Sequence, residues 1–150
     1  MKGLPILMSQ AEMTVSCPEC GAVPLNGMTC WEQLGAVIAW EYHDPELMAE
    51  HFFTVARYNL QHPAQFTDEA LVELHKSVIL RLDQQVPISQ IREHTTKMYN
   101  GSKRVLKPKE ERHPMLRSWL MTIADVYLPD HPENAAERVR AWAIAVRGEL

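Results

Sequence analysis

The most informative segment for the fold is Cys17-Pro18-Glu19-Cys20-Gly21-Ala22. A loop follows it, and then Cys30, the last cysteine of the chain. A Cys-x-x-Cys pair followed by glycine is typical of a zinc knuckle. The tight turn points two thiolates at one centre, and the glycine lets backbone amides approach the sulfurs. Cys30 adds a third thiolate, which leaves one tetrahedral position for a histidine. We therefore expect zinc to tie the N-terminal segment to the rest of the protein.

Two other interpretations of the cysteines are weaker. Small core residues rarely occur as Cys-x-x-Cys-Gly in a loop without a metal. A thioredoxin-like redox pair needs a βαβ pattern around it, and the sequence has none.

Working outward from Cys30, apolar residues recur every three or four positions, which predicts a helix over residues 30–42 with one buried face: Trp31, Leu34, Val37, Ile38 and Tyr42. Asp44-Pro45 is a strong start signal for a second helix over 45–61, which Pro63 stops. These two segments predict a helical hairpin.

Similar signals predict helices over 68–86, 88–99 and 122–128, and a last helix that begins at Pro132. No period-2 strand pattern is found. The predicted fold is all-α: a compact bundle of about five to six helices, with the zinc-knuckle loop packed on the first hairpin. Residues 1–14 are expected to be a flexible lead-in, and residues 15–150 a single domain.

The composition agrees with one globular domain of 150 residues, with 46% hydrophobic and 23% charged side chains and a formal net charge of −4. An odd number of cysteines argues against a secreted disulfide scaffold. The first residues lack the features of a signal peptide, and no apolar run is long enough to span a bilayer. We therefore expect a cytoplasmic protein without a membrane partner.

Hairpin geometry ranks the histidines that are available for the fourth position. If the chain folds back near residue 44, Cys30 lies level with about residue 58. His62 then lies one turn beyond, roughly 6 Å along the axis, whereas His51 lies about 10 Å away. The preferred ligand set is Cys17, Cys20, Cys30 and His62, with His51 as the alternative to His62.

His51, Val55, Tyr58 and His62 share one face of the predicted second helix. This stripe is either a buried polar network that fixes the register of the helices or a pocket in which His51 and Tyr58 meet a ligand. In the pocket interpretation, His75 or Glu41 from adjacent helices would join them.

A basic loop covers residues 103–117, with six cationic side chains against Glu110 and Glu111: Lys103, Arg104, Lys107, Lys109, Arg112 and Arg117. Such a loop is usually a solvated segment, and contact with nucleic acid is the less favoured interpretation because no aromatic residues alternate with the charges. No phosphate-binding loop, His-Glu-x-x-His motif or nucleophile elbow occurs in the sequence.

The order Cys-Pro-x-Cys-Gly-Ala at 17–22, Cys30, then His51, Tyr58 and Gln61-His62-Pro63 resembles an uncharacterised bacterial family known only as a domain of unknown function. Thr122-Ile123-Ala124-Asp125-Val126 and Trp142-Ala143 fit the same pattern, so that the likeness covers roughly residues 15–145. The family often carries further tryptophans after Trp-Ala, whereas this chain has Val146-Arg147-Gly148. The resemblance implies a small cytoplasmic metal-binding helical protein, and it implies no activity.

The sequence thus favours a binding or adaptor module with structural zinc, since four protein ligands would leave no position for a substrate. Two alternatives stay open. One is a metal-dependent enzyme with a water at the fourth position and a His/Tyr pocket, and the other is a regulator that contacts nucleic acid through residues 103–117. The partner is unknown, and both a protein partner and self-association remain open.

Overall fold

The structure is a computed structural model, and it describes residues 15–98, 105–129 and 131–150. Within these ranges the chain forms seven α-helices and no strand longer than an isolated bridge, so the predicted all-α class is confirmed. The α-helices are α2 (Cys30–Trp40), α3 (Pro45–Ala49), α4 (His51–Leu60), α5 (Asp68–Gln84), α6 (Ile88–Met98), α7 (Ile123–Val126) and α8 (Ala135–Glu149). Three short 3-10 turns join them at Glu41–His43, Pro63–Gln65 and Lys109–Glu111.

Helices α2, α3 and α7 begin at residues whose side chains cap them. Thr29 and Glu32 form a reciprocal capping box at the start of α2, and Thr122 and Asp125 form another at α7. Asp44 accepts a hydrogen bond from the Leu47 amide, 3.1 Å away, at the start of α3. The predicted starts after Asp44 and at Thr122 are therefore confirmed.

The second predicted helix is in fact two helices. The chain turns at Glu50, whose backbone angles are φ −95° and ψ 6°, so that α3 and α4 replace one continuous helix over 45–61. No glycine or proline marks this point. The carboxylate of Glu50 lies 3.2 Å from the guanidinium of Arg140 in α8, a tertiary contact that a local pattern cannot encode.

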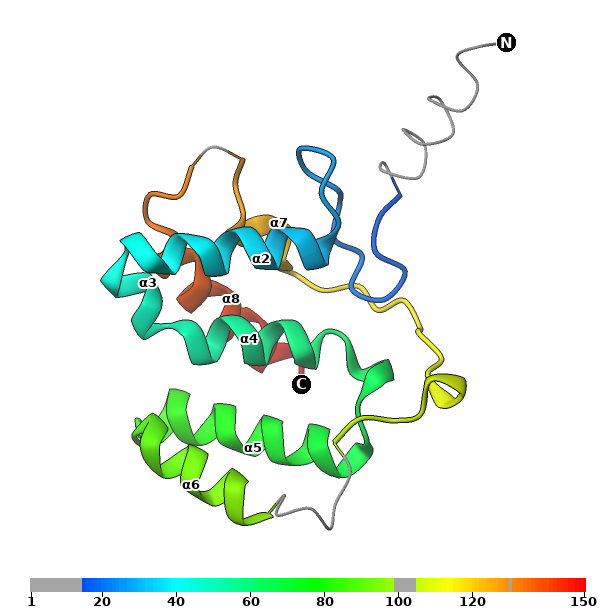
Figure 1. The fold of residues 1–150 in the computed structure, drawn as a ribbon, viewed down its shortest axis with the longest axis vertical. Coiled ribbons are helices and arrows are strands. Elements are labelled where there is room, and N and C mark those ends of the chain that lie inside the picture. The colour runs from blue at the N-terminus through cyan, green and yellow to red at the C-terminus, as the bar shows by residue number, and fades with distance from the viewer. Residues whose placement is uncertain (1–14, 99–104, 130) are drawn as a thin grey trace.

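Helix α4 lies at the centre of the molecule, between α2 on one side and α5 on the other, with α8 behind it (Figure 1). The core lies chiefly between α4 and α8. Trp142 is completely buried, and its indole donates to Oε1 of Gln61 at 3.3 Å. The amide of Gln61 in turn donates to the carbonyl of Met121 at 2.7 Å. These bonds fix the end of α4, next to His62, against two distant parts of the chain.

The inner face of α2 only partly follows the prediction. Leu34 and Val37 are buried, but Trp31 is 67% exposed. The helix ends at Trp40 and not at residue 42 as predicted, and Tyr42, in the 3-10 turn that follows, is 78% exposed. Helix α8 also begins three residues later than predicted, at Ala135, after Asn134 adopts a left-handed conformation with φ 61°. The lead-in of residues 1–14, together with Lys103 and Arg104 of the basic loop, lies outside the described residues.

In the part of the chain that the structure describes, every helix falls short of the length and apolar character that crossing a membrane requires.

Candidate metal centre

The knuckle, residues 17–22, is a tight turn closed by its own backbone. The amide of Gly21 donates to the carbonyl of Cys17, and the amide of Cys17 donates to the carbonyl of Ala22, both at 3.0 Å. Gly21 has φ +78°, a left-handed conformation in which a side chain would be strained. This turn places Cys17 and Cys20 on the same side of the loop.

Backbone amides also point at the sulfurs of the knuckle. The amides of Glu19 and Cys20 lie 3.5 and 3.4 Å from Sγ of Cys17, and the amide of Ala22 lies 3.4 Å from Sγ of Cys20. Amide donors favour the thiolate over the thiol, because they stabilise its negative charge. The glycine turn is thus suited to hold two thiolates.

The third cysteine and the histidine come from the helices. Cys30 is the first residue of α2 and is buried there. His62 follows directly after the end of α4, and its Nε2 lies 3.5 Å from Sγ of Cys30 and 3.6 Å from Sγ of Cys17. The ligand atoms of Cys17, Cys20, Cys30 and His62 all lie within 4.8 Å of one another, close enough to hold one metal ion.

Two of the separations in this cluster fit a tetrahedral ion. With Zn–S near 2.3 Å and Zn–N near 2.0–2.1 Å, a tetrahedral angle puts sulfur and nitrogen about 3.6 Å apart. The two sulfur–nitrogen separations at His62 match this edge length. The donor set of three sulfurs and one imidazole is also the set that zinc takes in structural sites.

Protons compete for the same atoms when no metal is bound. Hydrogen bonds from Cys20 and Cys30 hold the pKa of Cys17 far below the usual value for a thiol, whereas the neighbouring Cys17 and Cys30 raise the pKa of Cys20. Burial lowers the pKa of His62, but its contacts with Cys17 and Cys30 outweigh burial and raise that pKa to about 10. A metal ion would therefore displace protons from Cys20 and His62.

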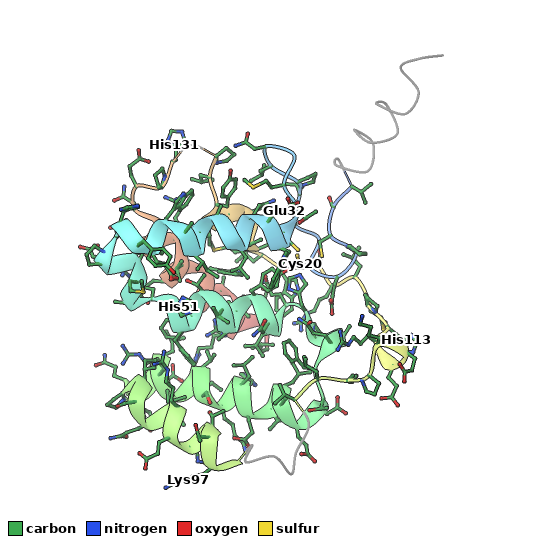
Figure 2. The ribbon with its side chains drawn as sticks, viewed as in Figure 1. Cys20, Glu32, His51, Lys97, His113 and His131 are labelled. Carbon is green, nitrogen blue, oxygen red and sulfur yellow. The ribbon has the colours of Figure 1, made fainter. Side chains whose placement is uncertain are left out.

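The structure places His51 away from this cluster. Its Nδ1 lies 2.7 Å from the carboxylate of Glu41, which is buried at the end of α2. Figure 2 shows Cys20 near the N-terminal end of α2 and His51 at the opposite end of the α2–α4 pair. Of the two candidate histidines, only His62 is brought to the cysteines.

Tyr58 belongs to the cysteine cluster and not to a pocket with His51. Its hydroxyl lies 3.3 Å from Sγ of Cys30, and its ring stacks on that of His62 with centroids 4.0 Å apart. The predicted register, with Cys30 level with residue 58, is confirmed by this contact. Burial and the hydrogen bond with Cys30 raise the pKa of Tyr58, so the phenol stays protonated and can donate to a thiolate.

The sequence analysis did not identify a role for Glu19, the residue between Pro18 and Cys20 of the knuckle. Its side chain is largely buried, and Oε2 accepts a hydrogen bond from the amide of Ala64 at 2.7 Å. Its carbonyl accepts from the amide of Arg117 at 3.1 Å. Glu19 therefore links the knuckle to the chain after His62 and to the segment before α7. Nothing in the local sequence indicates either contact.

Two arginines in the described part of the basic loop make contacts within the molecule. Nε of Arg112 donates to the carbonyl of Lys107 at 2.8 Å, and the guanidinium of Arg117 lies 3.9 Å from the centroid of Trp119 while it also donates to the carbonyl of Glu149. These contacts connect Arg112 to its own loop and Arg117 to α8.

Of the comparisons with known proteins, the one with family models gives a match. The chain has no significant match among curated proteins or among solved structures. The sequence model of DUF5946, a family of unknown function, matches residues 15–150, a range that begins just before the knuckle and contains all four clustered residues, so this chain belongs to that family.

Proposed function

We propose that residues 15–150 form a small helical binding module whose fold depends on one structural zinc ion held by Cys17, Cys20, Cys30 and His62. The observation that carries this proposal is the closed donor set, with sulfur–nitrogen separations of 3.5 and 3.6 Å. Four protein ligands complete a tetrahedral zinc, so no position is left for a substrate or an activated water. The ion then serves the fold, and its binding energy becomes folding energy.

The zinc would join the knuckle to the two central helices. The knuckle meets the helical body through the cysteine–histidine cluster, the bond between Glu19 and Ala64, and the buried side chains of Cys20 and Ala22. Structural zinc contributes on the order of 10–16 kcal/mol in small zinc-finger peptides, more than the whole stability of many domains. Such a site can therefore determine whether the N-terminal part of the protein folds.

A role in binding is supported by large apolar side chains that remain exposed. Trp31, Met115, Leu116 and Leu120 are between 67% and 80% exposed. Leu116 lies on the knuckle, where its Cδ1 would be 3.5 Å from a Cβ placed at Gly21. Contiguous exposed apolar surface commonly marks an interaction site.

The experiment that tests this function compares metal content with folding. Purified protein should contain one zinc per chain, and removing it with a strong chelator should greatly lower the midpoint of the thermal transition measured by circular dichroism. Restoring zinc should restore the original midpoint. A protein that keeps its fold and exchanges the metal freely would contradict the structural role and favour an open, catalytic site.

A further inference from the structure

A cavity of about 360 Å³ lies beside the candidate metal centre, on the side that His62 and Tyr58 face. Its walls come from the knuckle, from α2 and α4, and from the segment before α7, and include Glu19, Trp31, Tyr58, His62, Arg112 and Pro114. A volume of this size is within the range of about 300–1,000 Å³ that is common for small-ligand sites.

Two aromatic rings form a corner of this cavity. The rings of Trp31 and Tyr58 have centroids 5.9 Å apart and are tilted by 57°. Trp31 is 67% exposed although it sits on the apolar side of α2, so its π face is available to a ligand. Among the described residues, the cations that lie over rings are Arg57 on Phe53 and Arg117 on Trp119. The described guanidinium groups therefore leave the ring of Trp31 uncovered, whereas Tyr58 is 4% exposed and one face of its ring is stacked on His62.

The charges around the cavity favour a cation. Glu19 places a carboxylate in the wall. A zinc ion bound by three thiolates and a neutral imidazole carries a net charge of about −1. Arg112 is the positive side chain in the wall, and its Nε is already bonded to the carbonyl of Lys107 at 2.8 Å. Two negative groups thus oppose one positive group, and an anion would be repelled.

We propose that this cavity binds an alkylated ammonium group, either the quaternary ammonium of a small amine or a trimethylated lysine side chain of a protein partner. Such a cation is attracted to the exposed ring face of Trp31, and its methyl groups fill apolar space at a small desolvation cost. Glu19 and the thiolate centre supply the electrostatic attraction. This inference rests on the proposed function, because the charge of the centre depends on zinc bound by three thiolates.

The test titrates zinc-loaded protein with choline, tetramethylammonium and a trimethyl-lysine peptide at constant ionic strength, followed by calorimetry and tryptophan fluorescence. Saturable binding is expected for an alkylammonium, and the comparison of the free amines with the peptide identifies the source. Trp31→Ala should weaken binding about tenfold. Arg112→Gln should tighten it, since a like charge is removed. Ile144→Ala, an exposed change on α8 outside the cavity, should leave the affinity unchanged.

Four outcomes would overturn the proposal: no saturable binding, affinity that Trp31→Ala does not change, weaker binding in Arg112→Gln, or equal binding of 3,3-dimethylbutanol, the uncharged analogue of choline. The zinc content of each sample is measured in parallel. Absence of zinc contradicts the proposed function, whereas zinc-loaded protein that fails to bind the ammonium probes contradicts this inference alone.

Discussion

Nδ1 of His62 lies 2.6 Å from the carbonyl oxygen of Tyr58, one helical turn earlier in the chain. Since a carbonyl can only accept, Nδ1 carries the proton and donates it. In the neutral ring, Nε2 is then the free acceptor, and it is the atom that faces Cys17 and Cys30. Metal-binding histidines commonly have their tautomer and ring orientation fixed by such a bond. The end of α4 therefore presents an imidazole already oriented for a metal.

From this orientation we expect His62→Ala to weaken zinc binding far more than His51→Ala. Removing a ligand should weaken zinc binding by more than the 10–100-fold loss that is typical when a residue hydrogen-bonded to a ligand is changed. His51→Ala removes only the contact with Glu41, 2.7 Å away and remote from the cysteines. Competition with a chromophoric chelator measures both affinities. The reverse order of effects would assign the fourth position to His51.

Zinc affinity should rise with pH up to about 10, where His62 of the metal-free protein loses its proton. In the metal-free protein the pKa of His62 is raised to about 10, despite burial, by its contacts with Cys17 and Cys30. Zinc must displace this proton, so the competition weakens as the pH rises. Competition at several pH values, with calorimetry in buffers of different ionisation enthalpy, counts the protons released.

The proton on His62 also makes the stability of the metal-free protein depend on pH, but this stability falls as the pH rises. A raised folded-state pKa contributes stability that is fully present below the unfolded pKa, near 6.5, and is lost as the pH rises through about 10. His51→Ala should retain both pH dependences. An affinity that stays constant between pH 6.5 and 9 would contradict a protonated His62 in the metal-free state.

Two glycine substitutions should change stability in opposite directions. Gly21→Ala places a side chain at φ +78° and should cost about 1–2 kcal/mol. Gly35→Ala lies within α2, where an added Cβ would meet no atom within 4 Å, and should stabilise the protein by about 0.5–1 kcal/mol. Urea unfolding of the zinc-loaded protein measures both. Equal effects at the two positions would show that the knuckle turn does not require glycine.

Arg57→Met should stabilise the protein, although it removes a charged side chain. Arg57 is completely buried in α4, and none of its guanidinium nitrogens has a hydrogen-bond partner among the described residues. Burial, and secondarily Arg147, lowers its pKa to about 10. Removing an unpaired buried cation should gain about 1–3 kcal/mol.

The matched control for this position is Arg57→Lys, which keeps the charge but loses the planar contact of the guanidinium, 5.9 Å above the ring of Phe53. This variant should be less stable than wild type in urea unfolding. If Arg57→Met is the less stable of the two variants, the guanidinium has an acceptor beyond the described residues.

The sequence alone determined the features that depend on neighbouring residues. The cysteine spacing of the knuckle, the caps at Asp44 and Thr122 and the apolar periodicity of the helices are local, and each acts within about one turn. The proximity of His62 to Cys30 could also be predicted, because a helical hairpin with a known turn has a regular rise of about 1.5 Å per residue.

The contacts between segments far apart in the chain are visible in the tertiary structure alone. These include the pairing of Glu50 with Arg140 at the break between α3 and α4, the bond between Glu19 and Ala64, and the exposure of Trp31. A helical period tells which side chains share a face, but whether that face is covered depends on what packs against it. For this reason the cysteine–histidine cluster could be predicted from the sequence, whereas the cavity beside it could not.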